Sequence, residues 1–360
     1  MPAAPGRPRG RGRVRGLAGS LDEARANAAA GELRFAAAQD HAAMAGGVGS
    51  ISASLPVLVL EDRASGRRAF HFLMEGFGRS LVLGMWDDEV AERLFWFRDA
   101  FGPALDAAIQ ALGGIDAGAL MAEALQRGDE LHNRNGAATS MLAERIAEGM
   151  LRAGVDAETQ LRALATLRDN PQFFVAVPLA AARLALDAAD GIEGSTLVTG
   201  CGANGVDCGV RVSGLPGRWF TAPAERPAGV LFDGFAPGDI GPGCGDSLLV
   251  ECFGLGATVL PAAPAFWPTV GADAARAARI VEDARAIALG EHARYRVPGG
   301  VGPAPAGVDA LRVVETGIRP TIDIVMVHPE PGRGAIGFGL TQPPMACFEQ
   351  AVAALAEQLG

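Results

Sequence analysis

Apolar residues recur at three- and four-residue steps through the middle of the chain, between residues 87 and 190. The first run opens with acidic residues 87–89, where a helix dipole favours negative charge, and Pro103 interrupts it. This periodicity predicts a helical subdomain. Further helices are predicted over residues 105–112, 117–126, 137–152, 157–168 and 173–189.

After residue 191 the pattern changes to short apolar runs separated by glycine and proline, which is typical of β-strands. A helix is predicted at residues 273–289, and a last helix begins after Pro343 and Pro344. Strands are predicted over residues 195–199, 209–213, 218–221, 229–232, 248–252, 308–315, 321–327 and 334–340.

Near the N-terminus, Ser20 and Glu23 have the spacing of a capping box and predict a short helix that ends near Gly31. Two apolar runs, 56–60 and 69–74, flank a turn and predict a β-hairpin. Strands and helices do not alternate regularly along the chain. The predicted fold class is therefore α+β, with mixed strands and helices and a small helical insert subdomain.

The 360-residue length accommodates two or three domains, or one large domain with an insert. In the first sixteen residues arginine alternates with glycine and proline, a composition that buries too little apolar surface to fold. A nucleic-acid-binding arm is the alternative interpretation, although no aromatic residue lies among these arginines. The predicted parts are a disordered Arg/Gly/Pro-rich tail at 1–19, an N-terminal α/β part at 20–86, a helical subdomain at 87–190 and a C-terminal α+β domain at 191–360.

The net charge of −10 argues against nucleic acid or a membrane surface as the main partner, because both are anionic. The sequence has no signal-peptide pattern, and no apolar run approaches the roughly 18 residues needed to cross a bilayer. Five cysteines, none in a C-x-x-C pair, are typical of reduced thiols. We therefore expect a cytoplasmic protein.

Several classes of chemistry lack their sequence signatures. The chain contains no lysine, which excludes a Schiff-base lysine and a standard P-loop nucleotide site. It has no H-E-x-x-H motif or paired-cysteine spacing, so neither a metal site nor a cofactor is predicted. No G-x-S-x-G motif indicates a hydrolase nucleophile.

Residues 128–140 form the densest cluster of reactive groups, at the start of a predicted helix. His132 is a candidate general acid or base, and Glu130 lies close enough in sequence to orient it. Arg134 and the helix-start amides are a candidate clamp for a small anion. The alternative is a loop-locking and helix-capping network with an asparagine as N-cap. The remaining candidate substrate-binding residues of the cluster are Asn133, Asn135, Thr139 and Ser140.

Other candidates lie in the C-terminal half. Arg211 and Ser213 fall on one face of a predicted strand, about 7 Å apart, where they could share a ligand. Asp246 is a candidate catalytic carboxylate, and with Glu251 it could bind ureido or amide N–H groups. The alternative is a capping aspartate and a satisfied strand-end glutamate. Cys244 is a weaker candidate nucleophile, because no basic neighbour lowers its thiol pKa.

Six motifs that occur in order carry a resemblance to a known family, from about Gly31 to the C-terminus. They are Gly128-Asp129-Glu130-Leu131-His132-Asn133-Arg134-Asn135 with Ala137-Ala138-Thr139-Ser140, Asn204-Gly205 with Arg211-Val212-Ser213-Gly214, Arg218-Trp219-Phe220-Thr221-Ala222-Pro223, Gly245-Asp246-Ser247, Val314-Glu315-Thr316-Gly317-Ile318 and Pro343-Pro344-Met345. This set resembles the bacterial YlbE/YahG-like family, and the chain is expected to be a divergent member without the N-terminal region of full-length relatives.

The resemblance implies an α+β fold and a link to FdrA-type operons of purine and allantoin catabolism. A member of the family is a subunit of oxamate carbamoyltransferase. With FdrA-like and AllH-like partner subunits, that enzyme exchanges oxalurate and phosphate with oxamate and carbamoyl phosphate. All four ligands are small anions, which agrees with the anion clamp suggested by the helix start.

Two hypotheses about function follow. The first is an oligomeric, carbamoyltransferase-like enzyme or catalytic subunit that acts on a small carbamoyl, ureido or amide anion. Its assigned catalytic residues are His132, Glu130 and Asp246, and the remaining candidates bind the substrate. The second is a non-catalytic subunit that binds a small anion or assembles a multi-protein complex.

Overall fold

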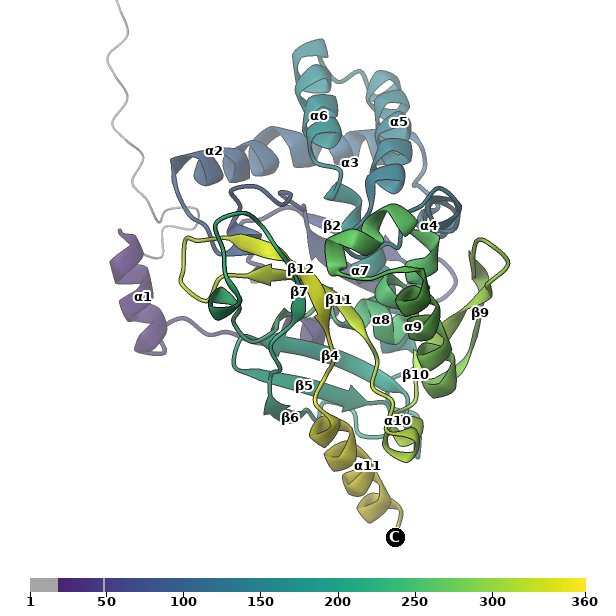
Figure 1. Cartoon of the computed structure of the whole chain (residues 1–360). Helices are drawn as coiled ribbons and strands as arrows, with labels where there is room; N and C mark the ends of the chain where they lie inside the picture. Colours follow the sequence, from purple (N-terminus) through teal and green to yellow (C-terminus); the bar gives the residue numbers. More distant parts are fainter. Residues whose placement is uncertain (1–18, 48) are drawn as a thin grey trace, which may run out of the picture.

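The computed structural model describes residues 19–47 and 49–360, and Figure 1 shows how the elements are arranged. The predicted tail lies almost entirely outside the described residues. Helices and several small sheets are mixed along the chain, which confirms the predicted α+β class. Short 3-10 helices connect many of them, at Ala38–His41, Leu81–Leu83, Phe173–Val175, Pro237–Asp239, Gly256–Ala262 (η6) and Pro264–Val270 (η7).

The N-terminal part contains one helix and one small sheet. Helix α1 (Leu21–Ala29) is capped by Ser20, whose hydroxyl accepts the Glu23 N–H, as the capping-box spacing predicts. Strands β2 (Val57–Glu61) and β3 (Arg68–Phe72) pair antiparallel, which confirms the predicted hairpin. The two-residue strand β1 (Ala43–Met44) adds to β3 in parallel.

The predicted helical region is confirmed. Pro103 lies in the first turn of helix α3, directly after a π-helical turn at Phe97–Phe101. Proline is tolerated in a first turn because an N–H group there has no partner within the helix. Helices α5 and α6 pack side by side at the top of Figure 1. The helices are α2 (Asp88–Trp96), α3 (Gly102–Ala111), α4 (Ala117–Gln126), α5 (Gly136–Ala153), α6 (Ala157–Asp169) and α7 (Ala176–Ala188).

The C-terminal half contributes three further sheets. An antiparallel sheet has the order β6-β5-β4-β8, a second has the order β11-β12-β7, and β9 pairs with β10 as a hairpin. The strands are β4 (Val198–Asn204), β5 (Asp207–Val212), β6 (Phe220–Pro223), β7 (Ala228–Leu231), β8 (Cys244–Gly245), β9 (Ala288–Val297), β10 (Gly302–Val308), β11 (Ile322–Val327) and β12 (Ala335–Thr341). The helices are α8 (Leu249–Phe253), α9 (Ala274–Ile287), α10 (Ala310–Thr316) and α11 (Met345–Leu359).

Two predicted strands are wrong. Residues 249–252 lie in helix α8 (Leu249–Phe253), because a short run that is apolar apart from Glu251 and buried throughout carries no period that separates helix from strand. The predicted strand 308–315 is the last residue of β10 followed by helix α10, which Asp309 caps through the Leu311 N–H. The β9–β10 hairpin was not predicted, although Gly299 and Gly300 mark its turn with positive φ.

One large hydrophobic cluster draws on all three described parts of the chain, with members such as Met44, Phe101, Phe173, Val210 and Phe348. Helix α7 is apolar on nearly every side, and it packs against β3, β4 and α8. The domain boundaries themselves stay a prediction. Among the described residues, no helix combines the length and the apolar character that a membrane crossing requires.

A buried histidine–carboxylate centre

A tight loop before helix α5 presents His132 to the interior. Leu131 has φ of +71°, a left-handed conformation that costs energy for a non-glycine residue. The Glu130 carboxylate holds the loop in this shape by accepting the backbone N–H groups of His132, Asn133 and Arg134 at 2.5–2.7 Å. Glu130 therefore contacts the backbone of His132 rather than its ring.

Two carboxylates from distant parts of the chain meet the His132 ring. Its Nδ1 atom lies 2.8 Å from Glu251 Oε1, on helix α8, and 2.7 Å from Asp323 Oδ1, on strand β11. The His132 side chain is 4% exposed, and the two carboxylate side chains are fully buried. We call these three side chains the buried centre.

Burial and neighbouring charge act on the buried centre together. Burial alone favours the neutral ring, but the negative charges of Glu251 and Asp323 outweigh it and raise the pKa of His132 well above its usual value. Burial raises the pKa of Glu251, although the charge of His132 opposes the shift. Burial and the charge of Asp323 likewise raise the pKa of Glu130. Without another cation, the ring thus holds its proton near neutral pH, a state that suits a proton donor better than a general base.

Several neighbours fix the three side chains. The Asn133 amide donates to Asp323 Oδ1 at 3.0 Å, and Gln172 donates to the His132 carbonyl oxygen at 2.8 Å. Gly256 lies against Glu251 and His132, and a Cβ atom at this position would stand 2.2 Å from Glu251 Oε1. Glu251 Oε2 and Asp323 Oδ2 are buried and have no hydrogen-bond partner.

The start of helix α5 differs from the predicted anion clamp. Asp129 Oδ2 accepts the Ala138 N–H at 2.8 Å, so the protein's own carboxylate caps the helix. Asn135 stands at the N-cap position, but its side chain donates to the His132 carbonyl and to Gln172 and makes no capping bond. Arg134 donates to the Gly128 carbonyl oxygen, and its side chain is 43% exposed.

The two hydroxyls of the motif have local partners. Thr139 donates to the Pro171 carbonyl and accepts the Phe174 N–H, which ties helix α5 to the segment before α7. Ser140 donates to the carbonyl of Gly136 one turn earlier. The alternative interpretation of the motif, a loop-locking network, therefore describes most of its hydrogen bonds, and any role in binding a substrate stays a prediction.

The C-terminal candidates lie in separate surroundings. Arg211 donates to Asp40 at 2.9 Å, whereas the Ser213 hydroxyl donates to the Ala189 carbonyl, so the two contact different partners. Asp246 accepts the N–H groups of Ala45 and Gly46 at 2.7 Å and is not paired with Glu251. Burial raises the pKa of the Cys244 thiol to about 11, which disfavours the thiolate.

Sequence reasoning missed Asp323 and the contact between His132 and Glu251. Both carboxylates lie far from His132 in sequence, so no local spacing indicates the buried centre. The absence of a metal-binding motif is likewise uninformative, because folding brings His132, Glu251 and Asp323 into an arrangement that could hold an ion, with ligand atoms within 4.8 Å of one another.

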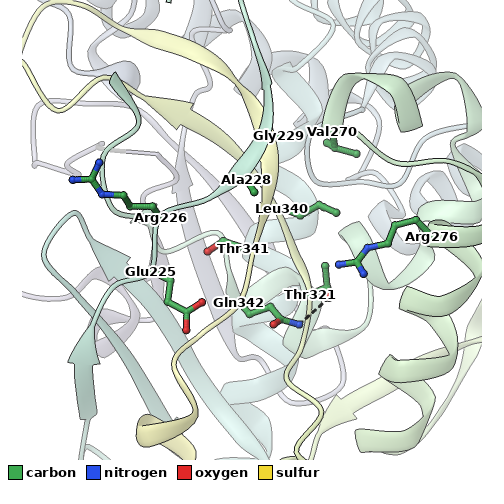
Figure 2. Close-up of a pocket in the computed structure, with 11 residues that line it drawn as sticks. Glu225, Arg226, Ala228, Gly229, Val270, Arg276, Thr321, Leu340, Thr341 and Gln342 are labelled. Atoms are coloured by element: carbon green, nitrogen blue, oxygen red, sulfur yellow. Dashed lines mark hydrogen bonds between the residues drawn. The ribbon is translucent and has the colours of Figure 1, made fainter. Parts of the chain in front are cut away.

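A cavity of about 480 Å³ lies near the beginning of β11. Its polar lining includes Arg226, Arg276, Thr321, Thr341 and Gln342. Figure 2 shows Arg276 directing its guanidinium toward Thr321, which also accepts a hydrogen bond from Gln342. Thr321 precedes Asp323 by two residues, about 7 Å of extended chain, but none of the three residues of the buried centre lines the cavity.

The comparison with known proteins decides the family. A family model described as oxamate carbamoyltransferase subunit AllG matches residues 33–247, which include the loop that carries His132. The chain belongs to the AllG family. This confirms the resemblance inferred from the six motifs.

Individual AllG-family relatives match beyond the region of the family model. The oxamate carbamoyltransferase subunit AllG of Escherichia coli (strain K12) is 39% identical over 334 residues, which cover 92% of this chain and 80% of that protein. The uncharacterized protein YahG of the same strain is 38% identical over 96% of this chain and 73% of YahG. A crystal structure of a conserved protein of unknown function from Enterococcus faecalis V583 matches with a TM-score of 0.93 and 35% identity, over 96% of this chain and 84% of that one.

Proposed function

We propose that this chain is a subunit of a carbamoyltransferase that acts on a small carbamoyl, ureido or amide anion. The observation that carries the proposal is the 39% identity to AllG over 92% of the chain. The aligned length is too great to reflect one shared motif or one shared domain. A reaction of this type transfers a carbamoyl group between the nitrogen of an amide acid and an oxygen of phosphate, and its substrates carry one or more negative charges.

The cavity in Figure 2 is the substrate site that we assign within this proposal. Its volume of about 480 Å³ falls in the range of small-ligand pockets. Arg276 supplies a guanidinium, which matches the planar geometry of carboxylate and phosphate groups. Thr321, Thr341 and Gln342 supply hydroxyl and amide groups for the carbamoyl end. This placement replaces the clamp at the start of α5, where Asp129 already caps the helix.

The first experiment is a carbamoyl-transfer assay. The full chain, alone and together with candidate FdrA-like and AllH-like partner proteins, is incubated with oxalurate and phosphate. Formation of oxamate and carbamoyl phosphate is then measured, and the reverse direction is run with those two compounds. We expect turnover that depends on this chain. Absence of transfer in both directions, with all partners present and folded, would argue against the proposal.

The second experiment tests the cavity. Arg276→Gln should raise the KM for the anionic substrate about 10- to 100-fold, because a charge-assisted hydrogen bond contributes about 1.5–3 kcal/mol. Arg279→Gln is the matched control, since Arg279 lies on the same helix and does not line the cavity. Equal kinetic constants for the two variants would remove the cavity from the proposal.

A non-catalytic binding or assembly subunit is the competing function. In that case the chain would bind the same small anions, measured by thermal stabilisation, but transfer by the assembled partners would not change when this chain is left out. Dependence of the rate on this chain distinguishes the two functions.

A further inference from the structure

The buried centre has more hydrogen-bond acceptors than donors. His132 Nδ1 carries at most one proton, yet it faces Glu251 Oε1 at 2.8 Å and Asp323 Oδ1 at 2.7 Å. The second oxygen of each carboxylate is buried and has no partner at all. Unpartnered buried carboxylate oxygens are costly, and their presence indicates that a positive group is part of the site.

Charge balance leads to the same conclusion. Glu130 is a third buried carboxylate in this region, and its oxygens accept the backbone N–H groups of His132, Asn133 and Arg134. Among the described residues, His132 is the one cationic side chain that pairs with Glu251 or Asp323, and no arginine contacts either carboxylate. A divalent cation would compensate the negative charge of Glu251 and Asp323 better than one imidazole can.

We propose that His132, Glu251 and Asp323 bind a divalent first-row metal ion of the Zn²⁺ or Mn²⁺ class. Nδ1 of a neutral imidazole and one oxygen of each carboxylate are the ligands. A nitrogen ligand beside two carboxylates favours these ions over Ca²⁺ and Mg²⁺, which prefer oxygen alone. The proposal goes beyond the proposed function and does not depend on it.

The geometry fits an ion with little movement. The three ligand atoms lie within 4.8 Å of one another, and ligand atoms around a first-row ion stand about 3.0–3.4 Å apart when each lies about 2.1 Å from the metal. The contacts of 2.7 and 2.8 Å therefore need to open by only a few tenths of an ångström. Asn133 donates to Asp323 Oδ1 and orients that ligand from behind, as outer partners do in metal sites.

Three ligands from the protein leave at least one coordination position for water or a substrate oxygen. The ligands come from the loop before α5, from α8 and from β11, so the ion would join three segments of the fold.

The test measures metal directly on the full chain. Protein purified without chelators is analysed by elemental mass spectrometry, then stripped and titrated with Zn²⁺, Mn²⁺ or Co²⁺ alone. We expect one ion per chain, a rise in melting temperature with added metal, and absorption bands of Co²⁺ bound to nitrogen and oxygen. Glu251→Gln and Asp323→Asn should weaken binding on the order of a hundredfold, because each replaces an anionic ligand by a neutral amide oxygen. Asn133→Ala should weaken it about tenfold.

Glu75→Gln is the matched control, because Glu75 is also a buried carboxylate but accepts the Leu81 N–H and lies outside the centre. It should bind metal like the unmodified chain. Circular dichroism identifies any variant that fails to fold. If the Glu251 and Asp323 variants do not fold, Asn133→Ala still tests the proposal, because it leaves all three ligands in place. No saturable binding by the unmodified chain, or equal binding by folded ligand variants, would overturn the proposal. Either result would leave the carbamoyl-transfer assay unaffected.

Discussion

Replacing Gly256 by alanine perturbs the buried centre with a single methyl group. Gly256 has φ of +62°, and an added Cβ would stand 2.2 Å from Glu251 Oε1 and 3.1 Å from His132 Cβ. The residue also donates its N–H to the Glu130 carbonyl oxygen, so its backbone has little freedom to move away. The methyl group must therefore displace the Glu251 carboxylate from the histidine.

Two costs contribute to the expected loss of stability. A left-handed conformation costs an alanine about 1–2 kcal/mol, and forcing an extra carbon into a packed site costs about 1–3 kcal/mol. Gly154→Ala measures the first cost alone, because Gly154 has φ of +68° and an added Cβ there meets nothing within 4 Å. We expect Gly256→Ala to lower the free energy of unfolding by about 1–3 kcal/mol more than Gly154→Ala does.

The assay is urea unfolding followed by tryptophan fluorescence and circular dichroism, with the midpoints of the three proteins compared at equal slope. Gly256→Ala should have the lowest midpoint. Equal midpoints for the two variants would refute the close approach of Gly256 to Glu251 on which the geometry of the buried centre depends.

Two further predictions concern buried titratable residues outside the centre. Burial lowers the pKa of His71 to about 4, so below about pH 6.5 the unfolded chain takes up a proton that the folded chain excludes. Unfolding free energy should fall by up to about 3 kcal/mol as pH falls from 6.5 to 4, and His71→Asn should remove that slope in pH-dependent urea unfolding; an unchanged slope would contradict the prediction. Asp129→Ala should cost about 1–2 kcal/mol by removing the cap on the Ala138 N–H of helix α5. A melting temperature equal to that of the unmodified chain would refute this role of Asp129.

Local patterns predicted the elements that depend on local interactions. The capped helix after Ser20, the hairpin of β2 and β3 and the helices between residues 87 and 190 were all expected from spacing. Helix α8 was predicted as a strand because it is short and buried, and its packing rather than its sequence period determines its form. Strand propensity likewise obscured helix α10, for which Asp309 was the available signal.

The candidate site shows the same contrast between features set by local sequence and features set by tertiary packing. The motif around His132 was recognisable because its loop is held by neighbours in sequence, such as Glu130. Glu251 was singled out, but with Asp246 as its expected partner. The contact of Asp323 with His132 depends on the packing of β11 against the loop before α5, which no local pattern in the sequence encodes. The residues that surround the imidazole are thus fixed by tertiary structure.

The order of synthesis gives the contact between His132 and Asp323 a further consequence. The loop and helix α5 leave the ribosome long before strand β11, which lies near the end of the chain. Until β11 is synthesised, Asp323 is not available to His132, and Glu251 is the one carboxylate of the centre that its ring can meet. Completion of the buried centre therefore requires the segment that contains β11, so a truncation before β11 should leave His132 and Glu251 without Asp323.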